Sequence, residues 1–188
     1  MLAQCLLRAR RVAAVDADDP VARLEASHRR TRDALALVEA LGEAVALDAS
    51  RTGVRDAASW LLRHFDVVWR HHRDDIQRHV VPLLAQGRDA GRGQRWQAQA
   101  ADAASAWQAV RPVLQGLAQA PAQGPDSLAG IAPDALRARL AALAATQAAC
   151  LRIEATEMMA PLARALDPIA SAWMVVDMAH RRSRRLAS

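Results

Sequence analysis

The stretch LLRHFDVVWRHHRDDIQRHVVPLL, residues Leu61–Leu84, decides the fold of this chain. It holds four of the six histidines of the protein together with three acidic side chains. Apolar residues recur along it at intervals of three or four, which places them on one face of an α-helix. The stretch therefore predicts a helix that carries many potential metal ligands, and the central question is which of those ligands face inward.

The composition of the whole chain also favours helix. Hydrophobic residues make up 52% of the 188 residues, but aromatic residues make up only 3%. Such a mixture, rich in Ala and Leu and poor in β-branched residues, is typical of helical proteins. A chain of this length suits one domain with a single core. We therefore expect an all-α protein of one domain.

Caps, prolines and glycines divide the chain into four long helices and a short fifth helix. Asp18-Asp19-Pro20 and Asp167-Pro168 each combine an N-cap with proline at the first helical position, and Pro112 predicts a kink in the third helix. The expected helices cover residues 20–47, 53–86, 94–118, 133–166 and 168 onward, with loops at 48–53, 87–93 and 120–132. Short connections favour antiparallel neighbours. We therefore expect an up-down-up-down four-helix bundle over residues 16–188, with residues 1–15 as an N-terminal extension.

Charge and cysteine content indicate the cellular setting. The net charge is +5, and its densest cluster is His180–Arg185, which we interpret as a solvated tail that caps the last helix. Cys5 and Cys150 form no CxxC pair, and the first residues lack the order of a secretory signal. No apolar run approaches the roughly 20 residues of a membrane span. These features predict a cytoplasmic, bacterial protein without a membrane or nucleic-acid partner, and they leave a homodimer open.

The order of the motifs resembles the hemerythrin-like (HHE cation-binding) family. The matching pieces, in chain order, are Asp18-Asp19-Pro20 with His28, His71-His72 with Asp74-Asp75, Val80-Val81-Pro82-Leu83, Met158–Arg164, and Met178–Arg182. The resemblance covers nearly all of residues 18–185. It implies a bundle whose interior binds two irons through histidines and carboxylates from all four helices, for oxygen or redox sensing.

The second predicted helix allows two registers for such ligands. In the first register His71 pairs with Asp75; in the second His72 faces inward, with Ile76 at the carboxylate position. A period of 100° per residue places His72 and Ile76 on the apolar face and His71 and Asp75 beside it. The same test selects Leu151 on the fourth predicted helix and places Glu154 on its flank. We therefore expect Ile76 and Leu151 to be buried, and Asp75 and Glu154 to lie at the boundary or in solvent.

In this register the metal centre is degenerate. The inward face keeps His28 and His72, and the other four ligand positions are occupied by Ile76, Ala103, Leu151 and Ala155. Two imidazoles alone neither balance the charge of iron nor fill its coordination shell. The sequence thus predicts a vestigial site, no cofactor, no catalytic residue, and a non-enzymatic binding or regulatory domain.

An alternative hypothesis keeps a working metal site in the flanking register. His28 would then join His71, Asp75, Cys150 and Glu154 to bind iron or zinc for oxygen, nitric oxide or redox sensing. The simpler interpretation treats Cys150 as a small buried residue. Three further histidines, His64, His71 and His79, are expected on a polar or boundary face, and the tryptophans at 60, 69, 96, 107 and 173 are expected to fill the core.

Overall fold

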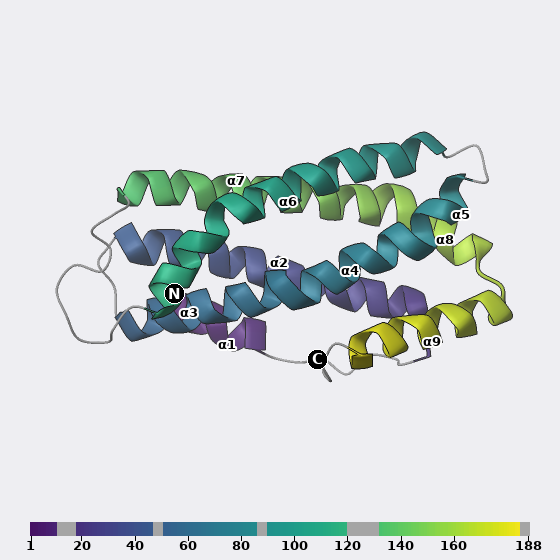
Figure 1. Ribbon diagram of the computed structural model, residues 1–188, viewed down its shortest axis with the longest axis horizontal. Helices are drawn as coiled ribbons and strands as arrows, with labels where there is room; N and C mark the ends of the chain where they lie inside the picture. Colours follow the sequence, from purple (N-terminus) through teal and green to yellow (C-terminus); the bar gives the residue numbers. More distant parts are fainter. Residues whose placement is uncertain (11–17, 47–50, 86–89, 120–131, 185–188) are drawn as a thin grey trace.

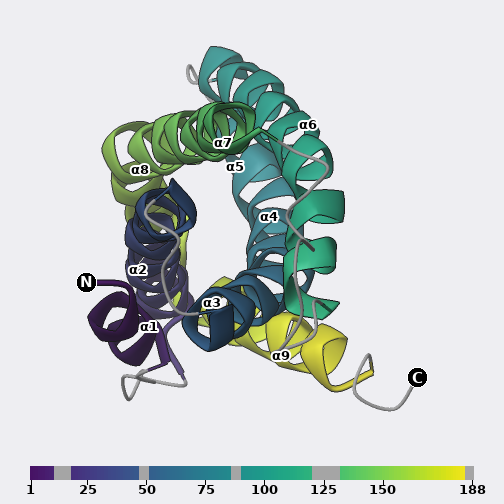
Figure 2. The same ribbon diagram turned by 90° about the vertical axis from the view of Figure 1, so that its left-hand side faces the viewer.

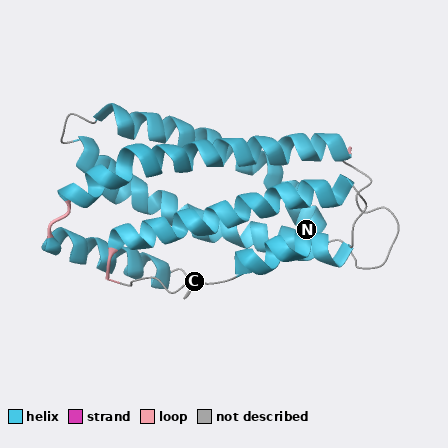
Figure 3. Cartoon of the chain, turned by 180° about the vertical axis from the view of Figure 1, so that it is seen from behind, coloured by secondary structure: helices cyan, strands magenta, loops and turns pink. Residues whose placement is uncertain are grey.

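Figure 1 shows a computed structural model of the chain, which describes residues 1–10, 18–46, 51–85, 90–119 and 132–184. Every regular element in this part of the chain is helical (Figure 3). The all-α class predicted from composition is confirmed. No helix within the described residues is both long enough and apolar enough to cross a membrane.

Four long helical segments make up most of the molecule. The first is α2 (Pro20–Ala46) and the third is α6 (Ala90–Gln119). The second is continuous through α3 (Arg51–Arg63), η1 (His64–Trp69), α4 (Arg70–Asp75), η2 (Ile76–Val80) and α5 (Val81–Ala85). The fourth is continuous through α7 (Pro133–Ile153), η3 (Glu154–Met158) and α8 (Met159–Ala165). The η elements are π-helical turns, whose hydrogen bonds join residues i and i+5. A shorter helix stands at each end, α1 (Leu2–Arg10) and α9 (Pro168–Arg184).

The long segments pack around a shared interior. Helix α2 packs against α3 and α7, and α6 packs against the same two helices, so each long segment has two neighbours (Figure 2). Leu37, Leu61 and Leu114 are fully buried in one part of the core, and Ile76 and Met158 are fully buried in the other. Each such side chain contributes roughly 1.5–3 kcal/mol by burial. The interior between the four segments is therefore the place where ligand side chains can meet.

The expected helix starts are confirmed where a cap precedes proline. Asp19 Oδ1 accepts a hydrogen bond from the backbone N–H of Val21 at 2.8 Å, directly before α2. Asp167 Oδ1 accepts one from the N–H of Ala170 at 2.7 Å at the start of α9. Each cap satisfies a backbone donor that the helix leaves unpaired, which is worth about 1 kcal/mol.

The glycine-rich stretch after the second segment differs from the prediction. Helix α6 begins at Ala90, so residues 90–93 are helical rather than part of a loop. A Cβ atom at Gly93 would lie 3.3 Å from Cγ1 of Val81, so glycine permits close contact between α6 and α5. The loop expected at 48–53 is also shorter than predicted, because α3 begins at Arg51 and residues 51–53 are helical. Residues 47–50, 86–89 and 120–131 lie outside the described residues.

Both terminal helices pack against the long segments. Residues 1–15 were expected to form an extension, and within them α1 packs on α2 and α3 with Leu6 and Ala9 buried. Helix α9 was expected to be short, but it has 17 residues. It buries Met174 and Met178.

Candidate metal centre

Each of the four long segments contributes one polar side chain to a single point in the interior. His28 comes from α2, His72 from α4, Trp96 from α6, and Glu154 is the first residue of η3. None of the four is more than 2% exposed. Glu154 Oε2 lies 2.6 Å from Nε2 of His28 and 2.6 Å from Nε2 of His72. We call His28, His72 and Glu154 the His–His–Glu cluster.

The second carboxylate oxygen of Glu154 is also engaged. Trp96 donates its indole N–H to Glu154 Oε1 at 2.7 Å, and the Cys150 thiol donates to the same oxygen at 3.5 Å. Burial, followed by the charge of Glu154, raises the pKa of the Cys150 thiol above its usual range. Cys150 is therefore a neutral thiol that donates a hydrogen bond to the carboxylate. It is not counted as a metal ligand, because the thiolate is the form that binds metal strongly.

Glu154 is ionised despite its burial. Burial acts to raise the pKa of this carboxyl group, but the nearby His72 and His28 lower it more, and the net pKa lies below the usual range. The two imidazole rings stand edge to face with their centroids 5.1 Å apart. Within the described part of the chain, Nδ1 of His72 is buried and has no hydrogen-bond partner.

The predicted burial pattern is only partly correct. His28, His72, Ile76, Ala103 and Leu151 are buried as predicted. Three other expectations are wrong: Glu154 is 1% exposed, Asp75 is 2% exposed, and Ala155 is exposed.

The error on the fourth segment has a simple physical cause. Gln147, Cys150, Glu154 and Met158 recur at intervals of three or four, which is as helical as the stripe chosen from the sequence. All four are buried. The stripe chosen from the sequence ran through Leu151 and Ala155 and left Glu154 on its flank. The spacing of Gln147, Cys150, Glu154 and Met158 was the signal that would have found Glu154.

The buried face of the second segment is wider than the single row of residues chosen from the sequence. His64 lies three residues after Leu61 and Asp75 three residues after His72, and residues three apart share one face of a helix. Both members of the adjacent pairs His64–Phe65 and Asp75–Ile76 are buried. Sequence periodicity allowed only one residue of each pair to face inward, so His64 was wrongly expected on a polar face.

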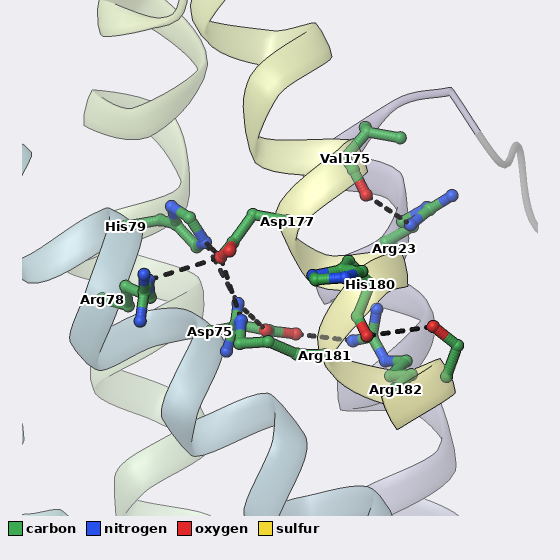
Figure 4. Close-up of polar contacts among 10 residues, drawn as sticks. Arg23, Asp75, Arg78, His79, Val175, Asp177, His180, Arg181 and Arg182 are labelled. Atoms are coloured by element: carbon green, nitrogen blue, oxygen red, sulfur yellow. Dashed lines mark hydrogen bonds and ion pairs between the residues drawn. The ribbon is translucent and has the colours of Figure 1, made fainter. Parts of the chain in front are cut away.

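Asp75 faces α9 and takes no part in the His–His–Glu cluster (Figure 4). Its carboxylate accepts hydrogen bonds from Arg181 at 2.7 Å and from Arg182 at 2.5 Å. Asp177 of α9 lies 2.9 Å from His79 Nε2 and accepts a bond from Arg181 Nε at 2.9 Å. We call Asp75, His79, Asp177, Arg181 and Arg182 the α9 clasp.

The α9 clasp corrects the interpretation of the basic C-terminal cluster. Arg181 and Arg182 are partly buried ion-pair partners rather than members of a solvated tail. Burial raises the pKa of Asp75, although Arg182 and Arg181 oppose that effect. The alternative ligand set of the flanking register therefore does not come together at one point. Glu154 and Cys150 reach the centre, but Asp75 binds α9, and His71 is half-buried and outside the cluster.

Among the remaining predictions, burial of Cys150 is confirmed and Trp173 is a clear exception. Trp173 is 70% exposed on α9, so it does not fill the core as expected.

No protein-family model, curated protein or solved structure matches this chain. The candidate metal centre is therefore interpreted from its own geometry.

Proposed function

We propose that this protein is a hemerythrin-like four-helix bundle that binds one divalent metal ion through His28, His72 and Glu154. In this proposal it is a non-enzymatic binding or sensing domain. The observation that carries the proposal is the convergence of two imidazoles and one ionised carboxylate, from three segments, on one buried point. The cyclic packing of the four long segments and the order of the sequence motifs support the bundle type.

The donor set fits a transition-metal ion. Two imidazoles and a carboxylate suit Zn²⁺ or Fe²⁺, whose bonds to such donors are about 2.0–2.2 Å long. Two donors at that distance stand roughly 3 Å apart when the angle at the metal is 90°, and about 3.4 Å apart in the tetrahedral geometry that Zn²⁺ prefers. The Nε2–Oε2 separations of 2.6 Å therefore need to open by about 0.4–0.8 Å. Three protein donors leave coordination positions at which the metal, when bound, would accept a small molecule such as oxygen or nitric oxide.

The surrounding residues favour one metal ion rather than two. A second ion needs a further carboxylate, and the buried carboxylate of the second segment, Asp75, is held by Arg181 and Arg182. Ile76, Ala103 and Leu151 are apolar and buried. This arrangement supports a centre with one metal ion in place of the two irons that the family resemblance implies.

The engagement of Glu154 supports a role without catalysis. Oε2 lies against both imidazoles, and Oε1 accepts hydrogen bonds from Trp96 and Cys150. Glu154 is thus fixed as a ligand and has no free oxygen with which to take a proton from a substrate. Trp96 and Cys150 act as positioning residues that hold the carboxylate toward His28 and His72.

Metal titration of matched variants tests the proposal. We expect dialysis against Co²⁺ or Zn²⁺, followed by elemental analysis, to give one ion per chain, and Glu154→Gln to weaken binding by at least about tenfold. Glu157→Gln is the control, because Glu157 lies in the same π-helical turn but pairs with Arg95 at the surface. Equal metal binding by the two variants, or no stoichiometric binding by the natural protein, would contradict the proposal.

A second candidate function is a metal-free regulatory bundle in which His28 and His72 are vestigial. The favouring observation is that Glu154 already receives four polar contacts, so the cluster is a closed network without metal. Such a network stabilises the interior because a buried carboxylate is costly unless it is paired. A folded protein that takes up no metal in the titration above would favour this candidate.

A further inference from the structure

An open hollow of about 460 Å³ lies between the second segment and α6, away from the His–His–Glu cluster. Its lining includes three arginines, Arg70 and Arg73 of α4 and Arg111 of α6. Its remaining walls come from three buried aromatic rings, a carboxylate, a methyl group and an amide side chain, namely Phe65, Trp69, Trp107, Asp66, Ala104 and Gln108. A concave site of this volume is large enough for a small molecule.

One of the three arginines is already neutralised. Arg111 Nε donates to both oxygens of Asp66, at 3.0 and 3.1 Å. Trp107 donates its indole N–H to Asp66 Oδ1 at 3.0 Å, which fixes the carboxylate from the other side. Arg111 and Asp66 therefore form a rigid, neutral wall of the hollow.

The other two arginines carry charge that no carboxylate compensates. Within the described residues, neither Arg70 nor Arg73 has an acidic group at ion-pair distance, although Asp74 lies one helical turn beyond Arg70. The guanidinium of Arg73 is held over the ring of Trp69, 5.2 Å from its centroid. Like charges three residues apart on one helix edge repel each other. The hollow thus presents two adjacent cations, and its one lining carboxylate, Asp66, is already paired with Arg111.

We propose that this hollow binds the phosphate group of a small phosphate ester. Guanidinium groups match phosphate because their N–H donors form paired hydrogen bonds with its oxygens. Arg70 and Arg73 supply the two positive charges that a phosphate monoester dianion requires. The volume beyond that charged edge exceeds what a bare phosphate fills and leaves room for the organic part, beside the polar side chain of Gln108.

Fluorescence and calorimetric titrations test this site in the full chain. Inorganic phosphate and glycerol phosphate are the probes, added at constant ionic strength with chloride as the compensating ion. Trp69 reports binding, because its ring contacts the Arg73 guanidinium. We expect saturable binding of both probes at one site, with glycerol phosphate binding at least as tightly as inorganic phosphate.

Two variants and a control locate the site. Arg70→Gln and Arg73→Gln should each weaken binding of both probes by about tenfold. Arg139→Gln should leave binding unchanged, because Arg139 is an exposed residue of α7 that does not line the hollow. Arg70 is exposed and has no ion-pair partner among the residues that the structure describes, so its variant tests the proposal even if Arg73→Gln does not fold.

Several results would overturn the proposal. A response that does not saturate, equal weakening by Arg139→Gln, or exclusion of glycerol phosphate while inorganic phosphate binds would each do so. The metal titration is independent of these results, because Glu154→Gln should leave phosphate binding unchanged.

Discussion

Two buried titratable residues of this protein respond to their surroundings in opposite ways. Glu154 keeps its charge because two imidazoles, an indole and a thiol contact its oxygens. His64 stays neutral because its surroundings offer little to a cation. Its ring stacks on Trp60 with 5.1 Å between the centroids, and its nearest polar contact is Thr31 Oγ1 at 3.4 Å. Burial, followed by the charges of Arg30 and His72, lowers the pKa of His64 to about 3.

This shift predicts a loss of stability in weak acid. In the unfolded chain His64 titrates near 6.5, but in the folded protein it takes up a proton only near pH 3. Its contribution is therefore complete above pH 6.5 and is lost as the pH falls from 6.5 toward 3. Between pH 7 and pH 5.5 the free energy of unfolding should fall by about 1 kcal/mol through this residue.

Urea unfolding at the two pH values measures the effect. His64→Phe keeps a flat ring against Trp60 and should remove this part of the pH dependence, whereas His180→Gln, at an exposed position of α9, should retain it. The same pH dependence in all three proteins would show that His64 is not the source.

At the residue scale, sequence alone predicted the burial of Ile76, Ala103, Leu151, His28 and His72, but not that of Glu154 and His64. Ile76, Ala103 and Leu151 were placed inside correctly because water excludes apolar side chains in any register that fits. Glu154 and His64 were missed because burial of a polar group depends on partners from other helices. Those partners include Trp96 of α6 for Glu154 and Thr31 of α2 for His64, which lie 58 and 33 positions away along the chain.

At the scale of elements, prolines and caps defined most helix boundaries correctly. The prediction of residues 20–47 matches α2 (Pro20–Ala46), and that of 133–166 matches α7 and α8. Pro112 lies within a single helix, α6. The π-helical turns could not be predicted, because i to i+5 bonding is not encoded by a local residue type but is stabilised by packing. They occur on the second and fourth segments, which carry His72 and Glu154.

The α9 clasp is the element-scale contact that sequence interpretation missed. It joins residues more than 100 positions apart, Asp75 with Arg181 and Arg182. We expect the double change Arg181→Gln with Arg182→Gln to lower the free energy of unfolding by about 3 kcal/mol, because it leaves Asp75 buried without a cation. Adding Asp75→Asn to that variant should restore part of the loss by removing the unpaired charge.

Urea unfolding compares these variants, and limited digestion with subtilisin, which does not require arginine at the cleavage site, reports release of α9. Arg164→Gln is the control, since Arg164 is exposed and should change stability by less than about 0.5 kcal/mol. If Asp75→Asn brought no recovery in the double variant, the arginines would stabilise α9 by contacts other than those with Asp75.

At the scale of the whole molecule, the His–His–Glu cluster ties three of the four long segments together at one point. Glu154 lies 126 positions after His28 and 82 positions after His72 along the chain. Its contacts with both histidines therefore restrain the arrangement of α2, the second segment and the fourth segment. An ion bound there would contact the folded state alone, because the unfolded chain does not hold the three donors together. Metal binding is therefore expected to be coupled to global stability.

The coupling predicts a metal-dependent melting temperature. At a free metal concentration one hundred times Kd, binding should stabilise the fold by roughly 2.7 kcal/mol. For a protein of this size each kcal/mol raises the melting temperature by about 2–4 °C, so we expect a rise of roughly 5–10 °C that a chelator reverses. Two imidazoles alone would hold metal too weakly for such a shift, so the carboxylate decides the outcome. Because Glu154→Gln is expected to bind metal at least about tenfold more weakly, it should show no more than about half of the rise at the same metal concentration, while Glu157→Gln should show the full rise. If calorimetry detected no rise in the natural protein at saturating Zn²⁺, the cluster would be a structural ionic network that holds the three segments together without metal.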